Sequence, residues 1–455
     1  MQESTIHRRR ERLSKITDGL GLGDAYNATI ERIKAQEGDK SRLGMEALMW
    51  ISHAERPLRL DELCHALATE LGSTDFHTNN IPSITTLVGC CQGLITVDKE
   101  TSTIRLIHFT LQEYLSANPD IFVRTHSTMA EICLTYLKSQ QVKELPANPF
   151  YHTRDTPFLE YSSVYWGVHA KRELSECARS LALELLQEYN GHISAERLLE
   201  KEVWGFDFDT DPVFNGLHCA SLFGIAEVLV CLIEMECYDL NERDFRGSTP
   251  LLWAAKKGHE EVVKILLERK EINPEKQDNW GQTPLWHAAR SGHAEAVKML
   301  LYREEVNPDK PDDHGNTPLS IAAQYGHENV VEILLRREEV NPEMVDNDGD
   351  TPLSCAAYDG HEGVVKILLR QDGVNPDTSN DAGQTPLSIA AQHGHSGVVK
   401  ILLEQEMVNP NKADNDGQTP LLYAARYGYQ KVIELLQSRE AVACDTLPDL
   451  GDTIV

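Results

Sequence analysis

The chain has 455 residues, of which 41% are hydrophobic and 25% charged, a composition typical of globular domains and not of disordered or membrane-spanning chains. Its formal net charge is −28: residues 1–210 hold 22 Lys/Arg against 30 Asp/Glu, and residues 211–455 hold 21 against 41. Such an acidic second half repels phosphate backbones and attracts basic partners, so we expect no contact with nucleic acid.

Nothing in the sequence indicates export or membrane insertion. No stretch approaches the ~20 apolar residues of a membrane span, and the N-terminus, with Arg8, Arg9, Arg10 and Arg12, lacks the apolar core of a signal peptide. The ten cysteines show no C-x-x-C pair, so we expect buried free thiols. These features predict an intracellular protein, cytoplasmic or nuclear or both, without membrane association.

Residues 1–40 are expected to be a linker or a remnant that precedes the first domain. They contain a glycine run, Gly19, Gly21 and Gly23, but a phosphate-binding loop needs a following Gly-Lys-Ser/Thr, and none of the 29 glycines in the chain precedes Lys. The run is therefore interpreted as a flexible loop. We expect no nucleotide, cofactor or metal site and no enzymatic activity.

Residues 41–118 show the order helix, helix, helix, hairpin, helix. The hairpin is predicted because two apolar runs flank a polar turn at 98–102. This order indicates a winged-helix domain. The expected elements are helices at Leu43–Ile51, Leu60–Leu71, Ile84–Cys91 and Phe109–Leu115, and strands at Leu94–Val97 and Ile104–His108.

A winged helix raises the hypothesis of DNA binding, and the residues argue against it. The third helix would enter the major groove, where Arg, Lys, Asn or Gln must meet base edges. Residues 83–94 contain no charged side chain, and the hairpin offers only Lys99 and Arg105 against Asp98 and Glu100. We therefore expect no DNA contact by this domain.

The stretch from Ile107 to Leu115 reads IHFTLQEYL, and the stretch from Trp50 to Leu58 reads WISHAERPL. Together they resemble the winged-helix domain of NACHT-type signalling ATPases, and fungal NACHT–ankyrin proteins across roughly residues 8–200. The resemblance implies that a NACHT-type module is a partner, and that His108 could sense a nucleotide. Because the ATPase core is missing, we favour an ordinary packing role for His108.

Residues 119–210 are expected to form a helical domain. Its amphipathic helices are predicted near Ser127–Lys138, Phe158–Arg172 and Leu174–Glu188.

Residues 211–440 repeat with a period of 34 residues. Thr-Pro-Leu recurs at Thr249, Thr283, Thr317, Thr351, Thr385 and Thr419, with an Ala-Ala pair and a Gly after each, and a first, degenerate unit begins at Asn215. Thr is a good N-cap, Pro is tolerated in the first helical turn, and Gly ends the helix, so each unit is predicted as a hairpin loop followed by two helices. The seven units resemble ankyrin repeats, which implies an α-solenoid. Residues 441–455 are expected to be a tail.

Stacked repeats keep constant the residues that pack and vary those that face outward. The residues that recur, such as Gly-His and the serines at 320, 354 and 388, are therefore interpreted as structural. The variable positions lie at the hairpin tips and after each Ala-Ala pair, which line the concave face of ankyrin folds. We predict that a partner binds there through Arg246, Lys257, Trp280, Gln282, Arg290, His314, Gln324, Tyr325, Tyr358, His393, Arg426 and Tyr427.

The sequence thus predicts a mainly α protein that acts as a scaffold or adaptor in signalling or nonself recognition. Two alternatives remain open. One is an ankyrin-repeat co-regulator that binds a transcription factor, for example to control a fungal metabolite gene cluster. The other, disfavoured by the missing phosphate-binding loop, is a nucleotide-switched ATPase.

Overall fold

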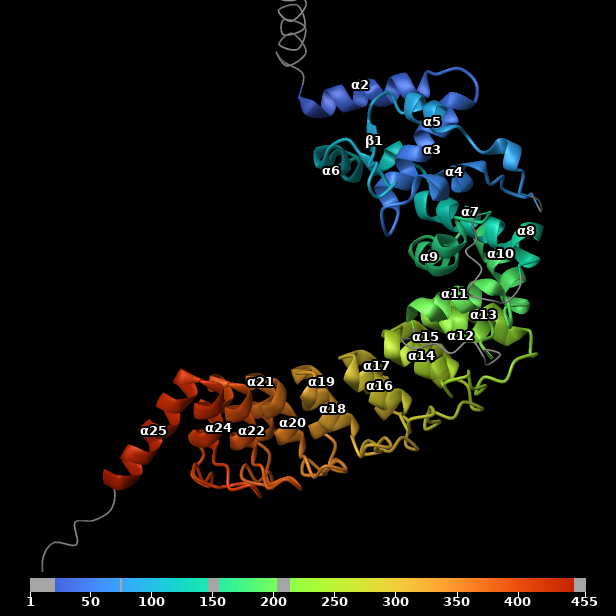
Figure 1. Ribbon diagram of the computed structural model, residues 1–455. Helices are drawn as coiled ribbons and strands as arrows, with labels where there is room; N and C mark the ends of the chain where they lie inside the picture. Colours follow the sequence, from blue (N-terminus) through green and yellow to red (C-terminus); the bar gives the residue numbers. More distant parts are fainter. Residues whose placement is uncertain (1–20, 74–75, 146–154, 203–212, 446–455) are drawn as a thin grey trace, which may run out of the picture. The chain divides into compact units, whose positions relative to one another are not determined.

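The computed structural model describes residues 21–73, 76–145, 155–202 and 213–445, with side chains to residue 439 (Figure 1). Residues 1–20, with the Arg8 to Arg12 cluster, and residues 446–455 of the expected tail lie outside this part of the chain, whereas residues 441–445 continue the last helix instead of starting a tail. Contacts divide the chain into two compact units, Met1–Cys219 and Ala220–Val455, and the division falls inside helix α12 (Gly216–Phe223). The predicted mainly α fold, with a winged helix followed by a solenoid, is confirmed.

The winged-helix part of the first unit follows the predicted order. Strands β1 and β2 pair antiparallel, with Ile95 opposite Leu106, and form the wing. Two 3-10 turns, Thr78–Asn80 and Pro119–Ile121, connect the longer elements. These elements are α3 (Asp39–His53), α4 (Leu60–Ala68), α5 (Ile84–Cys90), β1 (Ile95–Val97), β2 (Ile104–Leu106) and α6 (Phe109–Ala117).

A further helix, α2 (Leu22–Lys34), lies where a linker or remnant was expected. Its Tyr26, Ile30 and Ile33 are buried, because an i, i+4, i+7 spacing places them on one face, which packs against α3 and α6. The interpretation of the glycine run as a flexible loop is wrong for its described part, since Gly21 caps α2 and Gly23 lies in its first turn.

The segment that follows packs against the winged helix around Trp50 of α3, through α7 (Thr125–Lys138) and the start of α9 (Leu159–Arg172). Trp50 is fully buried, and its ring meets the rings of Phe158 and Tyr161 edge-on, with centroids 5.4 and 5.8 Å away. Edge-to-face aromatic pairs of this kind stabilise a core beyond the area they bury. The other helices of this segment are α8 (Gln140–Lys143), α10 (Glu176–Gln187) and α11 (Ile193–Glu202), of which the sequence predicted only α10.

The array places two helices in each repeat, with the hairpin loops aligned along one edge of the stack (Figure 1). The first helices are α12, α14 (Pro250–Lys257), α16 (Pro284–Arg290), α18 (Pro318–Gln324), α20 (Pro352–Asp359), α22 (Pro386–His393) and α24 (Pro420–Tyr427). The second helices are α13 (Ala226–Glu234), α15 (Glu260–Leu267), α17 (Ala294–Leu301), α19 (Glu328–Leu335), α21 (Glu362–Leu368), α23 (Ser396–Leu403) and α25 (Gln430–Asp445).

The Thr of each Thr-Pro pair caps its helix as predicted. The hydroxyl of Thr317, for example, accepts a hydrogen bond from the backbone N–H of Ser320 at 3.1 Å. In the degenerate first repeat, Asn215 takes over this role, and its side-chain oxygen accepts hydrogen bonds from the N–H groups of Leu217 and His218 at 3.0 and 3.2 Å. Asn is as good a cap as Thr, so this substitution preserves the helix start.

Burial in the second helices differs from what the recurring leucines predict. Leu recurs at one position of the second helix (Leu267, Leu301, Leu335, Leu369 and Leu403), which predicts that Leu335 packs between neighbouring repeats. In the structure Leu335 is half-buried, whereas Leu334 is fully buried. At the end of the array Leu436 is buried and Gln437 is exposed. The stack therefore closes on a polar residue, as a terminal repeat requires.

Two further findings concern the chemistry of the chain. The cysteines of the described residues are free, but they are not all buried, because Cys177 and Cys237 are exposed. No helix among the described residues is long and apolar enough to span a membrane.

Candidate protein-binding surface

The residue at each hairpin tip varies in side chain, while its backbone links neighbouring repeats. The carbonyl oxygen of Trp280 accepts a hydrogen bond from the N–H of Asp313 at 3.0 Å, and the carbonyl of His314 accepts one from Asn347 at 2.9 Å. Because the backbone supplies the link, any side chain is compatible with it. The tip side chain is therefore not required by the stack.

The first residue after each Ala-Ala pair behaves in the same way. The carbonyl oxygen of Arg290 accepts a hydrogen bond from His327 Nε2 at 2.9 Å, and that of Gln324 accepts one from His361 Nε2 at 2.8 Å. The recurring histidines are thus donors that lock one repeat to the preceding one. Among the described residues, no group of three or more His, Cys, Asp or Glu is placed to hold a metal ion.

The predicted contact residues differ in the fraction of each side chain that is exposed to solvent. Trp280 is 39% exposed, Tyr325 45%, and Tyr358 and Tyr427 each 50%. Large exposed aromatics at positions that packing does not require are typical of binding surfaces. Of the others, Arg290, His314 and Arg426 are exposed, and Arg246, Lys257, Gln282, Gln324 and His393 are half-buried.

The structure brings several of these side chains together in pairs. The guanidinium of Arg246 lies 5.0 Å from the ring centroid of Trp280. That of Arg290 lies 5.0 Å from the ring of Tyr325, whose hydroxyl accepts a 3.0 Å hydrogen bond from Arg290 Nη2.

Two more pairs lie farther along the array. The rings of Tyr358 and His393 approach to 4.3 Å, and Arg426 lies 5.9 Å from the ring of Tyr427. The surface therefore consists of paired side chains distributed over several repeats.

Two exposed or partly exposed residues lie outside the predicted set, Lys256 on the same face and Leu422 on the open end of the stack. Lys256 lies 4.8 Å from the ring of Trp253, next to the predicted Lys257. Leu422 is 49% exposed, although the equivalent Ser354 and Ser388 are buried. The exposure of Leu422 follows from its place in the last repeat, so alignment of the repeats alone could have indicated it.

The Asp or Asn at the base of each hairpin turn accepts hydrogen bonds from the N–H groups of its own loop. Asp278 Oδ1 accepts from the N–H groups of Trp280 and Gln282 at 3.0 and 2.9 Å, and its Oδ2 accepts from His287 Nε2 at 3.0 Å. Burial lowers the pKa of His287, although the bond to Asp278 opposes the shift. These turn carboxylates stabilise the loops instead of meeting a partner.

Asp244 occupies the same position one repeat earlier. Its Oδ2 accepts a 2.8 Å hydrogen bond from Trp253 Nε1, and burial raises the pKa of Asp244 to about 6 despite that bond.

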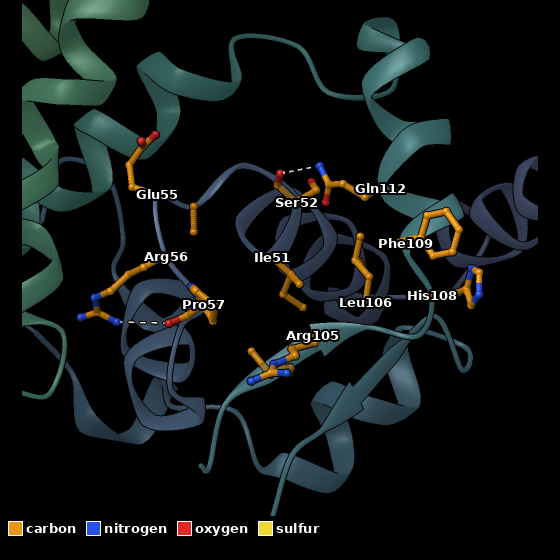
Figure 2. Close-up of a pocket in the computed structure, with 12 residues that line it drawn as sticks. Ile51, Ser52, Glu55, Arg56, Pro57, Arg105, Leu106, His108, Phe109 and Gln112 are labelled. Atoms are coloured by element: carbon orange, nitrogen blue, oxygen red, sulfur yellow. Dashed lines mark hydrogen bonds between the residues drawn. The ribbon is translucent and has the colours of Figure 1, made fainter. Parts of the chain in front are cut away.

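A pocket of about 360 Å³ lies beside the wing in the first unit (Figure 2). Its polar lining includes Arg56, Arg105, His108 and Gln112; the amide of Gln112 donates a 2.8 Å hydrogen bond to the carbonyl of Ser52. Exposed apolar residues adjoin it, with Phe109 66% and Ile107 55% exposed.

His108 is exposed at this pocket and caps helix α6. Its Nδ1 accepts hydrogen bonds from the N–H of Thr110 at 3.3 Å and from its hydroxyl at 2.9 Å. The structure therefore gives His108 a capping role, where the sequence favoured packing.

Comparisons with known proteins match both units. A family model described as ankyrin repeats (three copies) matches residues 217–312, 304–380 and 372–446, and a model described as the winged helix domain of GPI inositol-deacylase matches residues 31–133. Among solved structures, the ankyrin repeat domain of Bcl-3, described as a unique member of the IkappaB protein family, is 24% identical over 49% of this chain and 97% of its own, with a TM-score of 0.42. No curated protein matches the sequence.

Fold and surface together define a helical repeat protein of the kind that binds other proteins. The chain belongs to the ankyrin-repeat family and carries a winged-helix region before its repeats.

Proposed function

We propose that this chain is a non-enzymatic scaffold that binds a protein partner through the variable face of its array, meaning the hairpin tips and the positions after each Ala-Ala pair. The observation that carries the proposal is that the backbone and the side chain have different roles at these positions. The backbone of Trp280 and of Arg290 links the repeats, while both side chains face outward. Because packing of the repeats does not require these side chains, they can be the ones that contact a partner.

Replacement of Trp280 and Tyr325 by alanine tests the proposal. Trp280 and Tyr325 are exposed, each has a cation–π contact, and Tyr325 also accepts one hydrogen bond, so the double variant should melt within a few degrees of the native protein. Loss of two aromatic anchors should weaken capture of the cellular partner at least ~10-fold, because each anchor supplies ~2 kcal/mol or more when a partner desolvates it.

Tyr302 supplies a matched control. It is 88% exposed at the end of α17, outside the variable face, and its replacement by alanine should leave capture unchanged. Undiminished capture by the Trp280 and Tyr325 variant would place the binding surface elsewhere. A large drop in its melting temperature would show that these residues belong to the core.

The winged-helix pocket supports a second contact, with a NACHT-type module as the proposed partner. Phe109 and Ile107 place exposed apolar surface beside the polar side chains of Arg105 and His108. Phe109→Asp should abolish co-purification with such a module and leave capture by the array intact. Unchanged co-purification would contradict this contact.

The proposed role includes no catalysis. The recurring serines and histidines, the residue types that serve as nucleophiles and bases in enzymes, form hydrogen bonds within the array; Ser320 Oγ, for example, donates to the carbonyl of Thr317 at 3.0 Å. We propose an intracellular location, and imaging of the tagged protein decides between cytoplasm and nucleus. The same imaging would favour the co-regulator alternative if the protein were confined to the nucleus.

A further inference from the structure

Three histidine rings meet where the winged-helix domain contacts the helical segment that follows it, α7 to α11. His53 ends helix α3, His126 lies in the first turn of α7, and His169 lies in the last turn of α9. The rings of His126 and His169 stack with their centroids 5.2 Å apart, and the ring of His53 meets that of His126 edge-on at 5.8 Å. His169 is fully buried, and the other two are half-buried. This histidine cluster joins both parts of the first unit.

The two stacked rings share a hydrogen bond that requires an unprotonated nitrogen. His126 Nδ1 lies 2.9 Å from His169 Nδ1, so one of these atoms carries a hydrogen and the other accepts it. His169 Nε2 lies 2.9 Å from the hydroxyl oxygen of Tyr161, which also accepts a 3.1 Å hydrogen bond from the N–H of Glu55. Two protonated rings would place two N–H groups against each other. The pair can therefore take up at most one proton without losing this bond.

The surroundings of the cluster oppose a positive charge. Burial lowers the pKa of all three histidines, that of His169 to about 3. The positive charge of Arg172, at the end of α9, lowers each of these pKa values further. A proton added to the closed cluster therefore meets both a desolvated site and a nearby cation.

The acids that face the cluster are already engaged. Glu55 follows α3 and accepts two hydrogen bonds from the guanidinium of Arg172. Glu173 follows α9 and accepts a 3.1 Å hydrogen bond from the N–H of Ser127 in α7. Each carboxylate raises the pKa of His126, but by less than burial or Arg172 lowers it. Burial raises the pKa of the remaining titratable groups beside the cluster, so they stay neutral: Cys133 of α7 and Tyr161 of α9.

A fourth histidine, His65, lies where α4 meets the same segment. It is buried, its Nδ1 lies 3.3 Å from the hydroxyl of Tyr136 in α7, and its ring stacks on that of Phe76 at 4.8 Å. Burial lowers the pKa of His65, and the smaller effect of Asp61 opposes this. Helices α3 and α4 both contact α7, and each brings a histidine with a lowered pKa to that contact.

We propose that the junction between the winged-helix domain and the helical segment is a pH-sensitive contact, which holds at neutral pH and loosens in mildly acidic solution as its histidines take up protons. Once the contact loosens, water surrounds the imidazoles, and their pKa returns to the ordinary 6.5 of histidine. The lowered pKa values of the closed junction therefore contribute stability that is present above pH 6.5. This stability is lost as the pH falls from 6.5 toward the lowered values.

The junction should loosen before either part unfolds. Helix α7 packs more extensively against α9 and α10 than against α3 and α4. The aromatic contacts of Trp50 hold the junction at neutral pH, so the histidines set its pH dependence and not its existence. Glu55 also lines the pocket beside the wing (Figure 2), so loosening would reach the second contact proposed above. The loosening itself does not depend on that contact.

Hydrogen exchange of the full-length protein, resolved to single amides by mass spectrometry, tests the proposal at pH 7.5, 6.5 and 5.5. The amide of Glu55 reports on the junction, because its hydrogen bond to Tyr161 crosses it. The amide of Asn347, bonded to the carbonyl of His314, reports on the array. A histidine that stays neutral in the closed junction raises the equilibrium constant for loosening about 10-fold between pH 7.5 and 5.5. After correction for intrinsic exchange rates, we expect at least this loss of protection at Glu55 and no matching loss at Asn347.

His126→Asn removes one titrating ring and keeps an amide in place of Nδ1 for the bond to His169. Its loss of protection at Glu55 between pH 7.5 and 5.5 should be about 3–10-fold smaller than that of the native protein. His77→Asn is the matched control, because His77 is exposed in the same domain as His53, and it should behave as the native protein does. Circular dichroism at pH 7.5 checks that both variants fold.

Exchange of the imidazole C2 hydrogens in the native protein measures the titration midpoint of each histidine without a substitution. We expect midpoints below 6.5 for His126 and His169. Ordinary midpoints for both would overturn the proposal, as would equal protection of Glu55 at all three pH values or the full native pH dependence in His126→Asn. Simultaneous loss of protection in strands β1 and β2 would also overturn it, because the whole unit would then unfold instead of loosening at the junction.

Discussion

Replacing Gly326 with alanine should break the hydrogen bond by which His361 of the fifth repeat holds the fourth repeat. Gly326 has φ 74, and a Cβ built there lies 2.6 Å from His361 Nδ1 of the next repeat. The left-handed backbone costs an alanine about 1–2 kcal/mol. Displacement of His361 loses its 2.8 Å hydrogen bond to the carbonyl of Gln324, worth about 1 kcal/mol, together with some packing. The expected total is about 2–4 kcal/mol.

A substitution at Gly428 measures the backbone cost without the loss of the hydrogen bond. It has the same φ of 74 at the same position of the last repeat, but nothing lies within 4 Å of a Cβ built there. Gly428→Ala should therefore cost only the backbone share of about 1–2 kcal/mol. A second separation uses His361→Ala, in which the clash is absent and Gly326→Ala should again cost only that share.

Urea unfolding followed by circular dichroism measures these differences, provided that the slopes of the transitions agree between variants. Equal losses for Gly326→Ala and Gly428→Ala would refute the reasoning, because the histidine would then add nothing. Additive effects of Gly326→Ala and His361→Ala would refute it independently, since the lock requires the two residues to be coupled.

Three further predictions concern the array. Burial raises the pKa of Asp350 to about 6 from its ordinary 3.8, so the unfolded chain ionises first and stability falls as the pH rises between these values. Asp350→Asn keeps the acceptor for the hydrogen bond from Asn380. It should stabilise the array by about 1–2 kcal/mol at pH 7, a figure reduced for the partial exposure of Asp350, and should have no effect near pH 4. Equal stability of the variant and the native protein at pH 7 in urea unfolding would contradict this. Leu334→Ala should cost about 2–5 kcal/mol and Leu335→Ala clearly less, because only Leu334 is fully buried; the same unfolding measurement compares them. Hydrogen exchange should show the last repeat opening first, and uniform protection would show that its exposed Gln437 does not mark a weak end.

The repeat region could be predicted in detail because each of its rules is local and recurs. A Thr-Pro pair starts a helix through a hydroxyl and a fixed φ, whatever surrounds it. Six repetitions then turn a weak signal into a firm one. Even the degenerate first repeat keeps its start, because Asn215 supplies the oxygen that Thr supplies elsewhere.

The departures have physical causes that a single sequence shows poorly. Helix α2 carries Tyr26, Ile30 and Ile33 at helical spacing, but the neighbouring glycines indicate a loop. The difference between Leu334 and Leu335 depends on how far one second helix is rotated against the next, which periodicity leaves open. His108 has a polar partner two residues away, and its capping role depends on the backbone conformation there.

The net charge of the sequence differs from the charge that the binding face presents to a partner. The acidic sequence predicts a basic partner, since every carboxylate counts equally in a sum. In the folded array a carboxylate at the base of a turn, such as Asp278, lies buried and bonded to N–H groups, so its charge is directed away from a partner. Arg290 one helix later remains exposed. A partner therefore meets exposed side chains such as Arg290, whose guanidinium lies 5.0 Å from the ring centroid of Tyr325, and not the carboxylates buried at the bases of the turns.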